Sequence, residues 1–465
     1  MILALDLGTT NWKAVLLEEN GLLCQHAHIP TPLAQEDGCP CYDPLAMPQH
    51  LRELLGQLDA AALARADRVA LTGMAEAGLI LDRETLEPLS TIWPWFDRRA
   101  LPLFDRVKDQ PPFAGRETVT GLPNGFKYGI YKFLTLLEKG SYDRSRCLWM
   151  GLVAYAAALL TDERAEDVTI AARTFALNVH TRTWDMDFLH ALDLTEDNFP
   201  RLVHPGEAVG TLPDSRFGLK AGTKVCIGGH DHVCAAHACG LLEEGGVFLS
   251  TGTAQVMLGT CTGAETASGL SYGPCPAGPR YTCLGSIQSA GGSVNFWKGK
   301  LFPGEDFPVL LREAQEAPSP TGMLYFPYLG GSGAPHLNPH ARGGLLGLSE
   351  STVRGSIIAA VYEGLALESR YLLDHMTADI PSLTVMGGLT RHPRYMQTLA
   401  DVTGLRVQVP ALDEGTLYGA ARLCAPLPPL APACTYTPDP QRHAAWTQVY
   451  EQRYLPLMNL MQLEA

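Results

Sequence analysis

The sequence predicts an α/β protein of two related domains, each a mixed sheet flanked by helices, around a central cleft. Short apolar runs that end in Gly-rich turns alternate with segments of helical periodicity, as expected where strands and helices build one sheet. A strand–turn–strand pattern near the start, 2–17, returns at 246–258. Because the repeat lies about one domain further on, we expect domains at 1–240 and 241–465.

Composition limits the classes of partner. The 465 residues carry a formal charge of −14, so the chain lacks the basic surface that nucleic-acid binding needs. The longest apolar stretch, 147–160, is shorter than the roughly 20 residues of a membrane span and predicts a buried helix. There is no signal-peptide pattern, and the 12 cysteines include no CxxC pair. We expect a cytoplasmic protein with reduced thiols and no membrane partner.

The first segment predicts a strand at Ile2–Leu5, a turn at 6–10 and a second strand at Ala14–Leu17. Asn20-Gly21 is a strong hairpin signal, so Leu22–Cys24 is expected to return antiparallel. In the turn, Gly8 lets the backbone approach a phosphate, and Thr9 and Thr10 supply donors. Asp6 suits Mg²⁺ held through water. A plain hairpin turn is the alternative, because Asp, Gly and Thr are common there.

The middle of the chain continues the alternation. We expect strands at Arg68–Thr72 and Leu79–Leu81, and helices at Lys132–Glu138 and Leu148–Leu160. Lys224–Ile227 predicts a strand that ends in Gly228-Gly229, followed by a helix at Asp231–Cys239.

Two glycines before Asp231 indicate close backbone approach by a ligand, and a plain N-cap is the alternative. A metal site of His230 and His232 is disfavoured. No third ligand stands at a recognisable spacing, and helical phasing would separate the two imidazoles.

The last third predicts the same design. We expect a strand at Leu383–Met386, a turn at Gly387-Gly388 and a helix at Tyr395–Thr403, followed by a strand at Val407–Val409 and a helix at Gly415–Leu423. Ser250-Thr251-Gly252-Thr253 is a donor-rich turn without an acid, suited to the other side of a phosphate chain. Two chance Gly-Thr hairpins are the alternative to a true repeat. Residues 426–440 are expected to wrap the surface.

Taken together, these motifs resemble the FGGY family of carbohydrate kinases, within the actin, hexokinase and Hsp70 ATPase fold. The resemblance covers about residues 1–425 and depends on the order and spacing of its motifs. They are the opening DLGTT, Trp95-Phe-Asp97-Arg-Arg99, Thr120–Pro123 leading to Lys132, Asp167–Thr174, Gly228–Asp231, Ser250–Thr253, Tyr325–His336 with Arg342–Leu348, Gly387–Leu389 and Glu414–Ala421. The resemblance implies two RNase H-like domains.

The resemblance also implies an ATP-dependent kinase that phosphorylates a hydroxyl of a small sugar, sugar acid or polyol. Asp231 matches the family's catalytic base, and Asp6 and Asp231 would lie near Mg²⁺. ATP would bind Gly8, Thr9, Thr10, Gly252, Thr253, Gly387 and Gly388, with the two phosphate turns acting from opposite domains. Domain closure would exclude water. Homodimerisation is common in the family, and the sequence gives no independent sign of it.

Candidate substrate ligands are Glu76, Trp95, Asp97, Lys127, Asp231 and His232. Glu76 is similar to the polyol-binding Glu of glycerol kinases, although their preceding Arg is Ala75 here. Lys127 stands where those enzymes have a substrate-lining Tyr, and it would favour an acidic sugar if it points inward. For Glu76 and Lys127 a surface ion pair is the alternative, and for Trp95 a core position. The Glu of the family's E-R-x-P-H segment is absent at Ser332–Ala334.

Two other functions remain as alternatives. One is a catalytically silent member of the same fold that binds nucleotide and a partner protein, which intact Asp6, Asp231 and Gly-Thr turns argue against. The other is a nicotinamide-dependent oxidoreductase, which is disfavoured because no GxGxxG follows the first strand.

Overall fold

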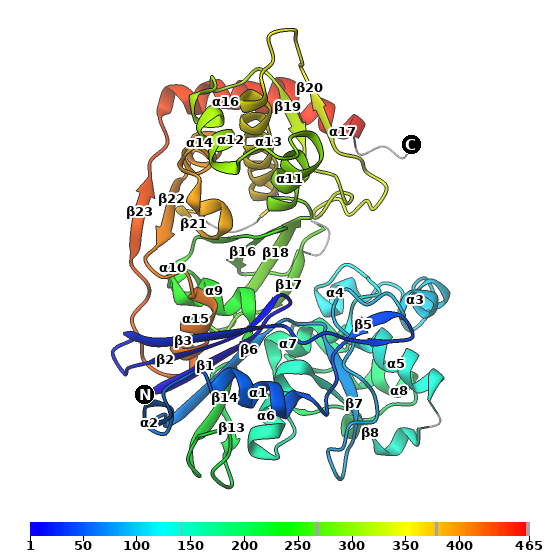
Figure 1. Cartoon of the computed structure of the whole chain (residues 1–465). Helices are drawn as coiled ribbons and strands as arrows, with labels where there is room; N and C mark the ends of the chain where they lie inside the picture. Colours follow the sequence, from blue (N-terminus) through cyan, green and yellow to red (C-terminus); the bar gives the residue numbers. More distant parts are fainter. Residues whose placement is uncertain (141, 266–268, 377–379, 462–465) are drawn as a thin grey trace. The chain divides into compact units, whose positions relative to one another are not determined.

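The computed structural model describes residues 1–140, 142–265, 269–376 and 380–461, which form two compact units (Figure 1). Unit 1 comprises Met1–Gly240, Tyr272–Thr282 and Glu414–Pro429. Unit 2 comprises Leu241–Ser271, Cys283–Asp413 and Leu430–Ala465. The chain leaves unit 1 after residue 240, and two later segments belong to unit 1 again.

Unit 1 contains a six-stranded mixed sheet in the order β13-β14-β6-β1-β2-β3. β1, β6 and β14 are parallel neighbours, and β1–β2 and β2–β3 are antiparallel pairs, which confirms the predicted hairpins. The strands are β1 (Ile2–Leu7), β2 (Asn11–Leu17), β3 (Leu23–Pro30), β6 (Arg68–Gly73), β13 (Ala208–Thr211) and β14 (Lys224–His230). The parallel strands end at one edge, where Asp6, Gly73 and His230 lie at or next to the last residue.

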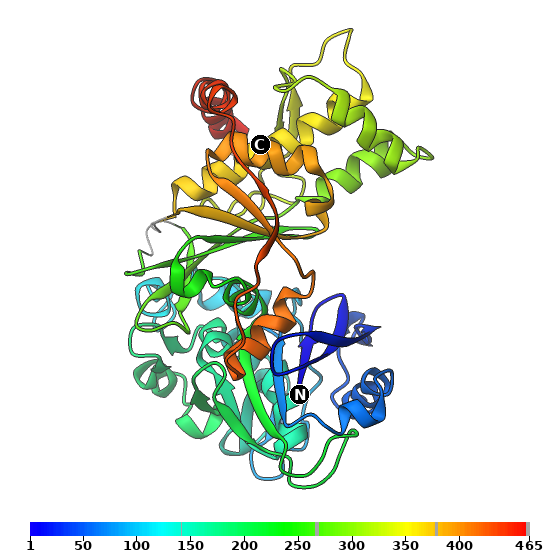
Figure 2. The ribbon, with the colours of Figure 1, turned by 90° about the vertical axis from the view of Figure 1, so that its left-hand side faces the viewer.

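Helices cover this sheet and bury its apolar side chains. They are α1 (Met47–Leu55), α2 (Ala60–Leu63), α6 (Leu152–Thr161), α7 (Val168–Ala171), α9 (Asp231–Ala238) and α15 (Gly415–Cys424). Figure 2 shows α15 (orange) beside the blue and green strands of unit 1, although it comes late in the chain. The close approach of α15 to α9 requires Gly419, because a Cβ there would lie 1.8 Å from the carbonyl oxygen of Cys234.

The single helix predicted for 147–160 is wrong at its start. Cys147–Gly151 form strand β8, which pairs antiparallel with β7 (Gly78–Asp82), and α6 begins only at Leu152. Every residue of β8 is buried. A strand buried on both faces and a buried helix show the same unbroken apolar run, so periodicity could not separate them.

A second part of unit 1 packs around an aromatic core that includes Tyr131, Phe133, Trp149 and Phe175. Its helices are α3 (Leu101–Val107), α4 (Glu117–Thr120), α5 (Gly129–Lys139) and α8 (Met186–Ala191). The short strands of unit 1 are β4 (Ala34–Glu36), β5 (Cys39–Cys41), β9 (Ala165–Asp167), β10 (Leu177–Asn178), β11 (Thr183–Trp184) and β12 (Arg201–Val203).

The second sheet has seven strands in the order β17-β18-β16-β15-β21-β22-β23. β15 pairs antiparallel with β16 and parallel with β21, which repeats the β2-β1-β6 arrangement of unit 1. The strands are β15 (Val247–Thr251), β16 (Gln255–Cys261), β17 (Ser271–Pro274), β18 (Tyr281–Ile287), β21 (Ser382–Gly387), β22 (Arg406–Pro410) and β23 (Pro432–Tyr436), and a separate pair is formed by β19 (Leu324–Phe326) and β20 (Gly344–Leu346).

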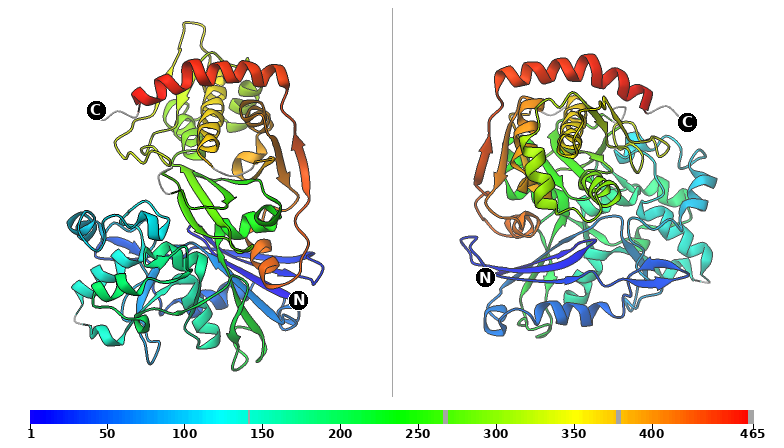
Figure 3. Two further views of the ribbon diagram at one scale, coloured as in Figure 1. Left: turned by 180° about the vertical axis from the view of Figure 1, so that it is seen from behind. Right: turned by 45° about the horizontal axis from the view of Figure 1, so that its top comes forward.

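The helices of unit 2 are α10 (Leu241–Glu244), α11 (Gly291–Phe296), α12 (Phe307–Glu316), α13 (Arg354–Asp374), α14 (Pro393–Thr403), α16 (Pro440–Val449) and α17 (Leu455–Met461). Figure 3 (left) shows the red C-terminal helices crossing the yellow α13. Tyr450 donates a hydrogen bond to Asp374 at 2.6 Å, which joins these helices. Single turns of 3₁₀ or π helix are η1 (Arg144–Arg146), η2 (Ala172–Thr174), η3 (Glu196–Asn198), η5 (Trp297–Leu301), η6 (Gly388–Arg391) and η7 (Tyr450–Tyr454).

The expected surface wrap at 426–440 contains a strand that the sequence did not reveal. β23 pairs antiparallel with β22 at the edge of the second sheet, and its side chains are mostly exposed. An exposed edge strand buries no alternate side chains, so it leaves no period-2 pattern. Within the described residues, no helix combines the length and apolarity that crossing a membrane requires.

Candidate active site

Asp231 is the first residue of α9, directly after β14. The preceding Gly229 has φ +123°, and a Cβ there would lie 2.6 Å from Thr169 Oγ1 and 3.1 Å from Asp167 Oδ1. Only glycine fits this backbone against the 167–169 turn. The two glycines therefore have a structural reason, and they deliver Asp231 to the edge of the sheet where the parallel strands end.

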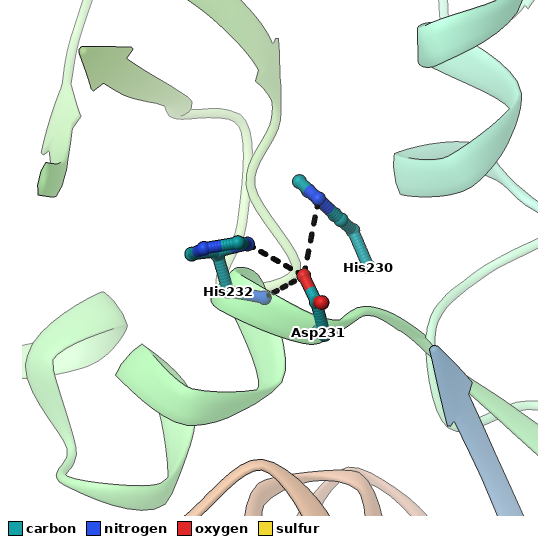
Figure 4. A group of neighbouring side chains, drawn as sticks. All are labelled: His230, Asp231 and His232. Carbon is teal, nitrogen blue, oxygen red and sulfur yellow. Dashed lines mark hydrogen bonds and ion pairs between the residues drawn. The ribbon is translucent and has the colours of Figure 1, made fainter. Parts of the chain in front are cut away.

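The carboxylate of Asp231 is held on one side only (Figure 4). Oδ1 lies 2.5 Å from His232 Nδ1, 2.6 Å from the His232 backbone N and 3.2 Å from His230 Nε2. Oδ2 accepts no hydrogen bond from the described part of the chain. Burial alone would raise the pKa of Asp231, but His232 and His230 lower it to about 2. The carboxylate is therefore ionised at neutral pH, with one open oxygen.

The sequence predicted that helical phasing would separate His230 and His232, and this prediction is wrong. His230 is the last residue of β14 and His232 lies in the first turn of α9, so both rings turn back to the residue between them. Ligand atoms of His230, Asp231 and His232 lie within 4.8 Å of one another. Both imidazoles point at the same carboxylate oxygen, which is an arrangement of hydrogen-bond donors around an anion.

Asp6 on β1 belongs to the same edge of the sheet. Burial and, after it, the negative charge of Asp231 raise the pKa of Asp6 to about 7, against the opposing charge of Lys13. Its Oδ1 is buried without a hydrogen-bond partner. An orphaned carboxylate oxygen close to a second carboxylate is a group that a divalent cation would satisfy.

The turn at 6–10, which we expect to bind phosphate, joins β1 to β2 and lies next to Trp95. Thr9 and Thr10 are exposed, and Trp95 Nε1 donates a hydrogen bond to Thr9 Oγ1 at 3.0 Å. Trp95 is 42% exposed, so it is not a core aromatic. Gly8 lies in the same turn, where its carbonyl accepts a hydrogen bond from Thr31 Oγ1 at 2.7 Å.

Glu76 lies between two cations. Its Oε1 accepts hydrogen bonds from Arg173 Nε at 2.9 Å and Nη2 at 2.6 Å, and lies 3.5 Å from Lys127 Nζ. Burial opposes ionisation, but Arg173 and Lys127 hold the pKa of Glu76 well below its usual range. The Glu76 and Arg173 side chains are 9% exposed and Lys127 is 41% exposed. The ion pair expected as the alternative for Glu76 and Lys127 is thus present, but around a buried carboxylate.

Asp97 lies deeper than the sequence indicated. Its side chain is fully buried, and both carboxylate oxygens accept hydrogen bonds from Arg99. Arg99 also contacts Glu36. This geometry favours a role for Asp97 in positioning the 94–99 loop rather than in direct contact with a substrate.

The turn at Gly252 and Thr253 lines a pocket of about 220 Å³ in unit 2, together with Gly388. Val294, Phe307, Leu389 and His392 give it an apolar wall. Gly387 does not line the pocket but permits its geometry: its φ is +109°, and a Cβ would lie 2.4 Å from the carbonyl oxygen of Thr251. Three of the four predicted ATP ligands of unit 2 thus line one small hollow.

Several residues of these sites were missed from the sequence. Arg173 is the main partner of Glu76, and His230 is a second contact of Asp231. Arg173 stands in the Asp167–Thr174 motif that resembles the family, and this resemblance could have identified Arg173 as a site residue. The pocket wall at Phe307 and His392 left no motif. A larger hollow of about 680 Å³ in unit 1 contains none of the predicted site residues.

The two mixed sheets, each with an antiparallel hairpin and a parallel neighbour, form the actin-like ATPase fold. The chain belongs to the FGGY family of carbohydrate kinases: the family's N-terminal domain matches residues 1–238 and its C-terminal domain matches residues 247–426. It is therefore a carbohydrate kinase.

Named relatives agree with this class. A glycerol kinase of Gloeobacter violaceus is 30% identical over 447 residues, covering 90% of this chain and 86% of the relative. The solved xylulose kinase of Lactobacillus acidophilus superposes with a TM-score of 0.88 at 22% identity, covering 99% of this chain and 98% of that one. The gluconate kinase of the same organism gives 0.89 at 22% identity, covering 100% and 98%. These two solved structures show the fold alone.

Proposed function

We propose that this chain transfers the γ-phosphoryl group of ATP to a hydroxyl of a small sugar, sugar acid or polyol, with Asp231 as the general base. The observation that carries the proposal is the one-sided environment of Asp231, where His230 and His232 hold Oδ1 and leave Oδ2 open. Relatives named glycerol, xylulose and gluconate kinases support a small polyhydroxy acceptor.

A carboxylate with a pKa of about 2 is too weak a base to ionise an alcohol beforehand. Phosphoryl transfer passes through a loose transition state, in which the base orients the oxygen in line and takes the proton late. Oδ2 of Asp231 would accept the hydrogen bond of the reacting hydroxyl. The donors from His230 and His232 to Oδ1 fix the carboxylate plane and so aim Oδ2.

Residues near Asp231 would bind the rest of the acceptor. Oε2 of Glu76 accepts no hydrogen bond from the described residues, so it is available to a substrate hydroxyl. Lys127 and His232 supply donors. The exposed face of Trp95 suits the C–H groups of a sugar. Asp97 would act through Arg99 on the loop that carries Trp95.

Asp6 and Asp231 would hold Mg²⁺. The unpartnered buried Oδ1 of Asp6 and its nearness to a second carboxylate fit a divalent cation. When bound, the ion would neutralise charge on the phosphate oxygens. Gly8, Thr9 and Thr10 in unit 1 would donate N–H and hydroxyl groups to phosphate. Gly252, Thr253, Gly387 and Gly388 would bind ATP in unit 2, with the apolar pocket wall against the base.

Asp231→Asn tests the role of the base. The amide keeps the shape but cannot take the proton, so we expect turnover to fall about 10³-fold, in the range that general-base catalysis contributes. ATP binding, followed by calorimetry, should remain. Asp109→Asn, whose side chain is 87% exposed, is the matched control and should keep its turnover. Unchanged turnover in Asp231→Asn would remove Asp231 from the mechanism.

A further inference from the structure

Two cations, Arg173 and Lys127, lie at the single carboxylate of Glu76. Arg173 and Glu76 form a buried pair of opposite charges, joined by the two hydrogen bonds to Oε1. Lys127 therefore shares a carboxylate that already has a closer cationic partner.

Further buried charges lie beside this pair. Lys132 is fully buried, and its Nζ donates hydrogen bonds to the carbonyl oxygens of Glu76 and of Pro94. The adjacent cluster of Glu36, Asp97 and Arg99 holds two acids and one base. Lys132, on which Asp97 acts, offsets this excess negative charge in part, because burial lowers the pKa of Lys132 to about 7.

Lys127 is the more distant of the two cations at Glu76. Its Nζ lies 3.5 Å from Glu76 Oε1, the oxygen that Arg173 already occupies at 2.6 Å. Among the described residues Glu76 is the one carboxylate within 4.0 Å of this ammonium. The Lys127 side chain is 41% exposed, so its ammonium is accessible to a ligand from solvent.

Arg98 adds to this positive character, and the carboxylate of Asp231 is paired with His230 and His232 rather than with Lys127. Arg98 is exposed and forms no ion pair with the described residues. Its guanidinium lies 5.9 Å from the ring centre of Phe126, the residue that precedes Lys127 in the chain. His230 does not contribute a charge, because burial lowers its pKa to about 4. In a chain with a formal charge of −14, a local excess of cations indicates a negatively charged ligand.

We propose, on the basis of the proposed function, that the acceptor is a sugar acid whose carboxylate binds Lys127 while its hydroxyls reach Glu76 and Asp231. Arg173 acts on Glu76 and His232 acts on Arg173 and Glu76 electrostatically, so these groups share one neighbourhood. A single ammonium matches the one charge of a carboxylate. A phosphorylated sugar carries about two charges and is the less favoured anion.

The test compares matched pairs of acceptors in which a carboxylate replaces one terminal hydroxymethyl group. ADP release is measured with glycerate, erythronate and gluconate against glycerol, erythritol and glucitol, and with glucose 6-phosphate. The wild-type chain and Lys127→Met, Lys127→Arg and Lys108→Met are compared. Lys108 is the control because its side chain is 40% exposed and lies on the same unit. Thermal unfolding checks that each variant is folded.

We expect the wild-type chain to prefer an acid over its neutral partner in kcat/KM. Lys127→Met should lower kcat/KM for the acid about 10- to 100-fold, mainly through KM, as expected for one charge-assisted hydrogen bond. The loss for the neutral partner should be clearly smaller, because it lacks the carboxylate that the ammonium would bind. Lys127→Arg should restore most of the preference, and Lys108→Met should not alter it.

Four results would overturn the inference. A wild-type preference for neutral polyols, or an equal loss for acid and neutral acceptors in Lys127→Met, would contradict a carboxylate at Lys127 and leave the kinase activity standing. A preference for glucose 6-phosphate over every sugar acid would replace the carboxylate by a phosphate. No ADP release with any acceptor would overturn the proposed function, and the inference with it.

Discussion

Glu76 has a backbone φ of 58°, in the left-handed region that residues with a side chain rarely adopt. The surrounding structure must impose this conformation, and such strain concentrates at functional sites. The bond from Lys132 to the Glu76 carbonyl and the pair with Arg173 supply that constraint. One residue therefore combines a strained backbone, a buried charge and an open carboxylate oxygen.

Glu76→Gln should destabilise the chain as well as weaken acceptor binding. Arg173 would lose its charged partner while it stays buried, which costs about 3 kcal/mol in comparable pairs. Urea unfolding measures the loss. Glu84→Gln is the control: it removes a carboxylate that is 65% exposed and lies 3.8 Å from Arg146, so we expect a change below about 0.5 kcal/mol. Equal effects of the two substitutions would contradict the role of the buried pair.

At the residue scale, the sequence identified the acids better than their partners. Asp231, Glu76 and the Gly-Thr turns stand in motifs that can be read along the chain. Arg173 meets Glu76 across 97 residues, and Asp97 meets Arg99 in a buried turn whose depth no local pattern reveals. Contacts of this kind depend on tertiary packing. The sequence therefore favoured a substrate contact for Asp97, whereas its buried position favours a role in positioning the 94–99 loop.

Helix α13 contains two buried acids that take no part in the proposed chemistry. Glu368 Oε2 accepts hydrogen bonds from Tyr328 at 3.0 Å and from Tyr454 at 2.5 Å, which ties α13 to η7. Burial raises the pKa of Glu368 to about 7, and the two tyrosine hydroxyls oppose that shift. Glu363, on the same helix, also has its pKa raised to about 7 by burial.

Glu368→Gln should flatten the pH dependence of stability. Between about pH 4.5 and 7 the folded chain holds a proton on Glu368 that the unfolded chain has released, so the free energy of unfolding falls as pH rises through this window. One such group contributes a slope of up to about 1.4 kcal/mol per pH unit. Urea unfolding at pH 5, 6, 7 and 8 measures it. Exposed Glu316→Gln is the control, and an unchanged slope in Glu368→Gln would contradict the assignment.

At the element scale, amphipathic and half-buried segments were predictable and uniformly buried or exposed ones were not. The β1–β2–β3 hairpins and α14 followed from turn chemistry and periodicity. The β8–α6 boundary did not, because both elements are apolar throughout. β23 is exposed along most of its length and was missed for the opposite reason.

For the whole molecule, the repeat of Gly-Thr hairpins predicted the two related sheets, and the order of the motifs predicted the family. The return of Glu414–Pro429 to unit 1 could not be predicted, because it depends on how α15 packs against α9. The charge of −14 argues against a broad basic surface and is compatible with local cations. Lys127, Arg173 and Lys132 show such a local concentration around one acid.

The central claim is that this chain is an ATP-dependent kinase for a small polyhydroxy acceptor. The most direct measurement is ADP release by the wild-type chain with ATP and Mg²⁺ across the acid and neutral panel, with ³¹P NMR of the products. The account predicts one phosphorylated acceptor for each ADP released, and little ADP without an acceptor. Nucleotide binding without acceptor-dependent ADP release would contradict it and would favour a catalytically silent member of the fold.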